Sequence, residues 1–271
     1  MQPQLIFIEG LPGSGKTTMS SMLYDYLKER KYNAQVYLEA QQFNPINLAG
    51  YAYLTPLEYK LLCKHFKREN FDNVVFGKDY VLVQYAVSKD TLYQGELLNF
   101  FKENEFCYKS NSRVNLDVFS RVMNERWKKL GEETQTDEIK IFDGDFFQHP
   151  IEDMMRNFSK NENEIIQYFA RVYDNIKDMN PMLFYISQKN ERESLARIAE
   201  ERNREIFRDP KMIGHWKERK SIELNAIKQI PIKSYVIDNS NYDWDNVFRI
   251  IIQTIEKEMK ETREKDNIEE R

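Results

Sequence analysis

A glycine-rich stretch at residues 10–17 limits what this chain can fold into more than any other part of the sequence. It reads GLPGSGKT, is followed by Thr18, and fits the pattern G-x-x-x-x-G-K-[ST], whose backbone amides cradle phosphate groups. Upstream, residues 5–8 form a short apolar run that is typical of a strand buried on both faces. Downstream, apolar residues recur at helical spacing, at Met19, Met22, Leu23, Tyr26 and Leu27. An ordinary glycine-rich turn is the alternative, but Lys16 and Thr17 with both flanks in place favour a phosphate-binding loop, the P-loop.

The chemistry of this stretch follows from its residue types. The glycines at positions 10, 13 and 15 permit backbone angles closed to other residues, so that successive amides can point at one anion. The helix that follows adds free N–H groups and a partial positive charge. Lys16 can reach the β- and γ-phosphates, and the Thr17 hydroxyl can ligate magnesium. We therefore predict a site for a nucleoside triphosphate with Mg2+, formed by Gly10, Leu11, Pro12, Gly13, Ser14, Gly15, Lys16, Thr17 and Thr18.

Composition restricts the class of protein. Of the 271 residues, 41% are hydrophobic and 31% charged, and the net charge is -4, which describes a soluble globular protein and gives no support for nucleic-acid binding. No apolar run is long enough to cross a membrane. The two cysteines, Cys63 and Cys107, suit a reducing compartment without a disulfide. We expect a single cytoplasmic domain over residues 1–271 that acts on a small molecule, and the sequence is compatible with a homodimer.

Alternating strand and helix patterns predict an α/β fold. Further strands are expected at residues 34–39, 139–143, 182–186 and 234–238, with helical patterns between them. This order indicates a doubly wound parallel sheet of about five strands, the P-loop NTPase type, with ligands beyond the carboxyl ends of the strands. A largely helical insertion at 41–135, between strands two and three, is expected to bind the acceptor. Residues 256–271 form a charged tail that reads as a solvated, fraying helix end.

Within the insertion, the local patterns differ in clarity. Thr55, Pro56 and Glu58 predict a capped helix start. Residues 74–83 fit either a hairpin near Gly77 or a strand followed by a helix. A helix is expected at 115–130, ended by Gly131 and the polar run at 132–138. Aromatic residues in this region could stack a planar acceptor or fill a core: Phe43, Tyr51, Tyr53, Tyr59, Phe100, Phe101 and Trp127.

Acidic residues follow two of the predicted strands. Asp143 ends the third strand, where its carboxylate could hold magnesium opposite Thr17. Asp145 could share that role or orient the acceptor, although acids beside Gly144 are also common in turns. Glu39 ends the second strand and could accept the proton of an attacking hydroxyl, and a solvated loop acid is the alternative.

An arginine-rich segment follows the fourth strand. We expect residues 189–210 to be a lid whose arginines close on the triphosphate and offset transition-state charge, with Arg197 and Arg202 as the catalytic candidates. Glutamates are interleaved with the arginines, so a salt-bridged solvent face is the alternative. The three histidines and two cysteines show no zinc-type spacing.

These residues resemble a known family. The sequence IEGLPGSGKTT at residues 8–18 resembles the first motif of the thymidylate kinase and deoxynucleoside kinase branch of P-loop kinases. Glu39 is similar in position to the general base of those nucleoside kinases, the arginine-rich segment resembles their lid, and residues 237–240 look like the loop near the adenine of ATP. The resemblance implies a five-stranded parallel core and phosphoryl transfer from MgATP to a small acceptor. Two departures stand out, because Gly144 follows Asp143 where those kinases carry an arginine, and residues 41–135 match no nucleoside-binding pattern.

The leading hypothesis is therefore a small-molecule kinase that phosphorylates a hydroxyl or phosphate group. Lys16 and magnesium would hold the triphosphate, and Glu39 or Asp145 would orient the acceptor. The alternative is a nucleotide-binding switch or ATPase module without a small-molecule acceptor. No Asn-Lys-x-Asp guanine signature is present, which disfavours a GTPase.

Overall fold

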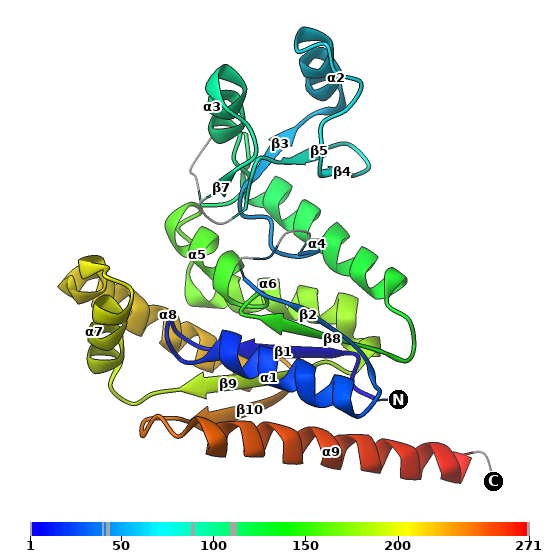
Figure 1. The fold of residues 1–271 in the computed structure, drawn as a ribbon, viewed down its shortest axis with the longest axis vertical. Helices are drawn as coiled ribbons and strands as arrows, with labels where there is room; N and C mark the ends of the chain where they lie inside the picture. The colour runs from blue at the N-terminus through cyan, green and yellow to red at the C-terminus, as the bar shows by residue number, and fades with distance from the viewer. Residues whose placement is uncertain (1, 40, 42–43, 88–89, 109–112, 270–271) are drawn as a thin grey trace. The chain divides into compact units, whose positions relative to one another are not determined.

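The computed structural model describes residues 2–39, 41, 44–87, 90–108 and 113–269 (Figure 1). The chain forms two compact units. The first contains Met1–Glu39, Gly131–Gln148 and Glu162–Arg271, and the second contains Ala40–Leu130 and His149–Asn161. Each unit is described by itself below.

The first unit is built on a five-stranded parallel sheet. Its strands are β1 (Leu5–Glu9), β2 (Asn33–Tyr37), β8 (Glu138–Asp143), β9 (Met182–Ser187) and β10 (Lys233–Asp238). They lie in the order β10-β9-β1-β8-β2, and all neighbouring pairs are parallel, so the predicted sheet is confirmed. The next two strands of this sheet along the chain, β2 and β8, lie on one side of β1, and the last two, β9 and β10, lie on the other side. A ligand crevice is expected at the carboxyl end of β1, where the direction reverses.

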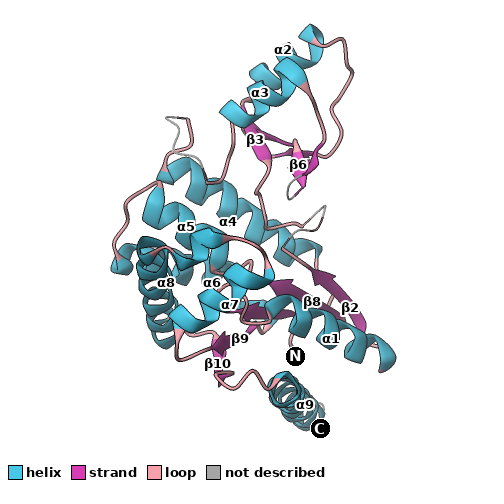
Figure 2. Ribbon diagram, turned by 60° about the vertical axis from the view of Figure 1, so that its left-hand side comes forward, coloured by secondary structure: helices cyan, strands magenta, loops and turns pink. Residues whose placement is uncertain are grey.

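Helices cover both faces of this sheet (Figure 2). On one face, α1 (Lys16–Glu29) and α9 (Trp244–Glu269) pack their apolar sides against alternate strand residues such as Ile6 and Ile8. The other face is covered by α6 (Glu162–Ile176) and α8 (Pro210–Gln229), which contact each other. Burial on both faces explains why the inner strands β1 and β9 are almost continuous apolar runs.

The structure gives the extent of three helical segments. The arginine-rich segment divides into α7 (Glu191–Glu201) and a short 3-10 helix, η2 (Glu205–Arg208). In the tail, α9 remains helical as far as Glu269. Gly131 does not end its helix, because α4 (Leu116–Glu133) continues past it. A single glycine costs a helix only about 1 kcal/mol, which neighbouring turns can offset.

The second unit combines helices with two small antiparallel sheets. One sheet has the order β3-β5-β4, from Tyr51–Leu54, Val81–Gln84 and Val74–Phe76, and the other pairs β6 (Ala86–Val87) with β7 (Asp90–Thr91). The antiparallel pairing of β4 and β5 decides the open question at 74–83 in favour of the hairpin. The helices are α2 (Pro56–His65), α3 (Gly95–Glu103), most of α4, and α5 (Gln148–Arg156) after its first residue. The expected insertion is thus helical in large part but also contains strands.

The local signals in this unit are explained by its contacts. Thr55 caps α2 as expected: the Thr55 hydroxyl accepts a hydrogen bond from the Glu58 amide, and the Glu58 carboxylate accepts one from the Thr55 amide. Five of the aromatic candidates for acceptor stacking are buried in the described part of the chain, which supports their core role: Tyr51, Tyr53, Tyr59, Phe101 and Trp127. Phe100 is partly buried, and Phe43 lies outside the described residues. Searched over the described residues, the structure contains no helix long and apolar enough to cross a membrane.

Candidate functional site

The glycine-rich stretch forms a tight loop between β1 and α1. Gly10, Gly13 and Gly15 all have positive φ angles, of 143°, 74° and 94°, and α1 begins at Lys16. Glycine is also required for packing, because a Cβ at Gly13 would lie only 1.5 Å from Cδ1 of Ile198 in α7. A loop of this kind at the end of the central strand of a parallel sheet turns backbone amides toward one anion. The fold is a P-loop fold.

Lys16 curls back over this loop. Its amine is buried and donates hydrogen bonds to the carbonyl oxygens of Gly10, at 3.0 Å, and Leu11, at 3.3 Å. Gly144 leaves room for the lysine, because a Cβ there would lie 2.9 Å from Lys16 Cε. The amine therefore has two carbonyl partners that it can exchange for phosphate oxygens.

Thr17 and Asp143 meet as the sequence predicted. The Thr17 hydroxyl donates to Asp143 Oδ2 at 2.6 Å, and Asp143 is fully buried. Burial raises the pKa of Asp143, and the positive charge of Lys16 opposes this shift. The second carboxylate oxygen, Oδ1, is buried and makes no hydrogen bond with the described part of the chain. An orphaned carboxylate oxygen beside a hydroxyl fits a magnesium ion, which in such sites takes one or two protein oxygens and completes its shell with phosphates and water.

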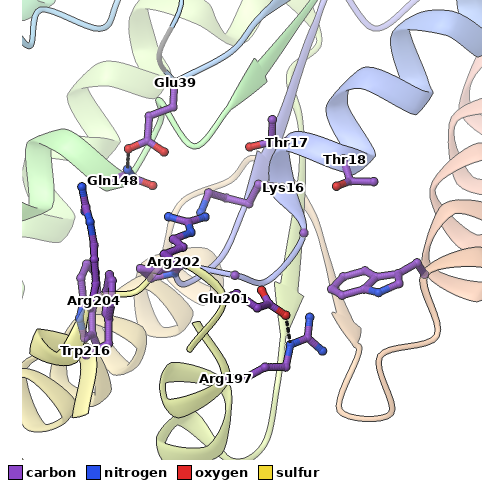
Figure 3. A pocket seen from close by; sticks show the side chains of 15 residues that line it. Lys16, Thr17, Thr18, Glu39, Gln148, Arg197, Glu201, Arg202, Arg204 and Trp216 are labelled. Carbon is purple, nitrogen blue, oxygen red and sulfur yellow. Dashed lines mark hydrogen bonds and ion pairs between the residues drawn. The ribbon is translucent and has the colours of Figure 1, made fainter. Parts of the chain in front are cut away.

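Glu39 lies two residues beyond β2, where its exposed carboxylate reaches the same region (Figure 3). The side-chain amide of Gln148, the first residue of α5, donates a hydrogen bond to Glu39 Oε1. Sequence analysis did not identify Gln148, because a glutamine five residues after a strand has no distinctive signal. Folding of the chain brings Gln148 close to the end of β2.

A cavity of about 430 Å³ joins these residues within the first unit. Its described lining consists of Pro12, Gly13, Gly15, Lys16, Thr17, Thr18, Glu39, Gln148, Arg197, Glu201, Arg202, Arg204, Phe207, Trp216 and Trp244. Four of these side chains are cationic and two are carboxylates, so the lining favours an anionic ligand. The volume lies within the range of about 300–1,000 Å³ that is usual for small-molecule sites.

The arginine-rich segment contributes three of the four cations. Arg197, Arg202 and Arg204 line the cavity, whereas Arg208 pairs with Glu205 and is not among the lining residues. Arg197 also forms an ion pair with Glu201 at 2.8 Å, and its guanidinium lies 4.1 Å from the centre of the Tyr242 ring. The segment therefore carries exposed ion pairs and also presents three arginines to the cavity at the P-loop, and its closure as a lid stays a prediction.

The residues that line the cavity differ in part from those that the sequence predicted for the site. Asp145 is buried and is not among the residues that line the cavity, so its expected role with the acceptor stays a prediction. Phe207, Trp216 and Trp244 do line it, although sequence analysis assigned them no role. They come from three separate segments, and their spacing in the sequence gives no indication that they meet.

A second buried carboxylate lies directly under the P-loop. Glu9, the last residue of β1, is fully buried, and its Oε1 accepts hydrogen bonds from the amides of Phe146, at 2.8 Å, and Phe147, at 3.3 Å. Burial raises the pKa of Glu9 to about 8, and the charge of Glu223 adds to the increase while Lys16 opposes it. Glu9 therefore anchors the loop that follows β8 and is largely protonated at neutral pH.

A buried ion pair lies next to Trp216, one of the residues that line the cavity. Arg219 Nε donates to Glu223 Oε1 at 2.7 Å, and the Tyr185 hydroxyl donates to Glu223 Oε2 at 2.6 Å, with all three side chains fully buried. The Arg219 guanidinium lies 5.0 Å from the ring centre of Trp216, a cavity residue. The hydrogen bond from Tyr185 to Glu223 links β9 to α8.

Comparisons with known proteins add the following. Neither a scan against protein-family models nor a search of curated proteins finds a match for this sequence. Among solved structures, the chain is similar to thymidylate kinase from Ehrlichia chaffeensis, with 17% identity over 94% of this chain and 100% of that chain and a TM-score of 0.45. It is also similar to thymidylate kinase from Candida albicans (12% identity, 94% and 92% covered, TM-score 0.44) and to deoxyadenosine kinase from M. mycoides with bound dATP (15%, 93% and 99%, 0.41). At these values the likeness carries no argument about function, and the P-loop fold follows from the chain's own sheet and glycine loop.

Proposed function

We propose that this protein is a kinase that transfers the γ-phosphoryl group of MgATP to a hydroxyl or phosphate group of a small molecule. One observation carries the proposal: Lys16, Thr17, Glu39, Arg197 and Arg202 all line a single cavity at the P-loop. A phosphate-binding loop alone would fit any nucleotide-binding protein. A carboxylate and several arginines around the same cavity supply the further groups that phosphoryl transfer needs.

Each group has a defined task in this proposal. The P-loop amides and Lys16 bind the β- and γ-phosphates, for which Lys16 gives up its bonds to the Gly10 and Leu11 carbonyls. The attacking oxygen of the acceptor forms a bond to the γ-phosphorus while the bond to the bridging oxygen breaks, and ADP leaves with that electron pair. Glu39 accepts the proton when the acceptor is a hydroxyl. Arg197 and Arg202 offset the charge that spreads over the phosphoryl oxygens.

Thr17 and Asp143 would hold the magnesium ion. When bound, the metal neutralises charge on the β- and γ-phosphate oxygens. The chain's own part is to keep the hydroxyl and the carboxylate in contact at 2.6 Å, so that both oxygens are in place before the nucleotide arrives. The two cysteines are free and buried, which is consistent with the cytoplasmic location that we propose.

The test is MgATP consumption against a panel of small acceptors such as nucleosides, nucleotides and sugars, with phosphorylated product detected by mass spectrometry. Lys16→Ala should lower turnover by a factor on the order of 10²–10³, as expected for loss of a preorganised cationic donor. Lys28→Ala, an exposed lysine of the same helix, is the matched control and should behave as wild type. Equal turnover by Lys16→Ala and wild type would contradict the proposal. ADP formation without any phosphorylated product would favour an ATPase or switch instead.

A further inference from the structure

We propose that Gln148 is a positioning residue that holds the carboxylate of Glu39 beside the phosphate site. The role rests on the proposed function, because it assumes that Glu39 accepts a proton there. Gln148 Nε2 donates a hydrogen bond to Glu39 Oε1, and both side chains line the cavity with Lys16 and Thr17 (Figure 3). Glu39 is an exposed side chain after the end of a strand, and this hydrogen bond restricts the rotamers that it samples.

The backbone around Gln148 is itself fixed. The two residues before it, Phe146 and Phe147, donate their amides to the buried carboxylate of Glu9. Both phenylalanine side chains are also fully buried. The start of α5 is therefore tied to the end of β1, one residue from the first glycine of the P-loop. This connection sets the position of Gln148 relative to the phosphate site.

The space that Gln148 needs is provided by Gly144. A Cβ at this position would lie 2.9 Å from Gln148 Oε1 and 2.9 Å from Lys16 Cε. The Gln148 amide and the Lys16 side chain thus occupy the volume that any other residue would fill. Gly144 has a φ of 75°, which favours glycine a second time.

An amide suits this task better than a charged group would. The hydrogen bond occupies Oε1 of Glu39, and Oε2 is the oxygen that we expect to accept the proton. Because Gln148 is neutral, it orients the carboxylate without placing a second cation against it. Its contribution is therefore geometric, and its loss should lower the rate of transfer while leaving nucleotide binding unchanged. A misplacement of about 1 Å can lower a rate by about a hundredfold.

The experiment uses MgATP hydrolysis, in which water replaces the acceptor, so that no acceptor needs to be known. The water oxygen bonds to the γ-phosphorus, ADP leaves, and the water proton passes to Glu39. Gln148→Met keeps the length of the side chain but removes the donor, and it should lower kcat by about tenfold to a hundredfold. The dissociation constant for MgATP and the thermal unfolding temperature should match wild type. Gln167→Met, an exposed glutamine of α6, is the control and should leave kcat unchanged.

A double-mutant cycle with Glu39→Gln separates the proposal from a general structural effect. If Gln148 acts through Glu39, Gln148→Met should add less than about a twofold further loss in the Glu39→Gln background. An equal loss in both backgrounds would overturn the positioning role, and so would an unchanged kcat for Gln148→Met in otherwise wild-type protein. Lys16→Ala distinguishes failure of the proposed function, because undiminished hydrolysis by that variant refutes the kinase site itself.

Discussion

Replacement of Glu9 by glutamine should make the protein more stable, by an amount that grows with pH. The pKa of Glu9 lies at about 8, against an ordinary value of 4.5, mainly because the carboxyl group is buried. In the unfolded chain Glu9 ionises near pH 4.5, whereas in the folded protein it keeps its proton. The stability that the proton provides is fully present below pH 4.5 and is lost as the pH rises toward 8.

The magnitude follows from the two pKa values. Each pH unit between them is worth about 1.4 kcal/mol, so the full loss approaches about 5 kcal/mol at alkaline pH. Between pH 5 and pH 7 the wild-type protein should lose roughly 2–3 kcal/mol relative to Glu9→Gln. Glutamine is a fair substitute, because its carbonyl oxygen can accept the same hydrogen bonds from Phe146 and Phe147. Its amide replaces Oε2, which has no hydrogen-bond partner among the described residues.

Urea unfolding at pH 5 and pH 7, followed by tryptophan fluorescence, measures this difference. Trp216 and Trp244 lie in the same unit as Glu9 and report on its unfolding. Glu29→Gln, an exposed acid at the end of α1, serves as the control for the change in net charge. It should have the pH dependence of wild type. If the difference in stability between Glu9→Gln and wild type is the same at both pH values, the account of Glu9 as a buried, protonated carboxyl group is refuted.

Three further predictions concern other parts of the site. Arg219→Leu should lower the free energy of unfolding by about 3–5 kcal/mol, because it leaves the buried Glu223 carboxylate without its cation. A loss below about 1 kcal/mol in urea unfolding would argue against that ion pair. Gly144→Ala should lower the free energy of unfolding by about 1–2 kcal/mol, because Gly144 has a positive φ. It should also weaken MgATP binding in a calorimetric titration, because the new methyl group meets Lys16. Unchanged affinity would show that Lys16 does not need this space. Arg202→Ala should lower kcat by a factor on the order of 10²–10³, with a smaller change in the KM for ATP. Arg192 is exposed and is not among the residues that line the cavity, so Arg192→Ala should have the kcat of wild type. Equal effects of the two variants would contradict a lid role for Arg202.

The sequence predicts the core of the first unit well because its signals are local. The P-loop depends on glycines within six positions, and β1 and α1 flank it directly, so spacing alone identifies all three. The inner strands β1 and β9 are buried on both faces and appear as short apolar runs. The contact between Thr17 and Asp143 follows from the parallel register, since the carboxyl ends of neighbouring strands meet at one edge.

The rest of the site depends on contacts between distant segments. Gln148 reaches Glu39 across more than a hundred residues of chain, and Trp216 and Trp244 enter the cavity from separate helices. From the sequence, Glu9 is only part of the motif at residues 8–18, because no sequence pattern indicates that an acid at the end of a strand is fully buried. The hairpin of β4 and β5 remained open for another reason, since short apolar runs fit a strand or a buried helix equally well.

The central claim is that the loop from Gly10 to Thr17 binds the phosphates of a magnesium nucleotide, with Lys16 as its principal cation. Calorimetric titration of MgATP into wild-type protein and Lys16→Ala tests this most directly. We expect one nucleotide to bind per chain, with at least about a tenfold loss of affinity, or about 1.4 kcal/mol, in the variant. Wild-type protein that binds no MgATP, or a variant that binds it equally well, would contradict the claim.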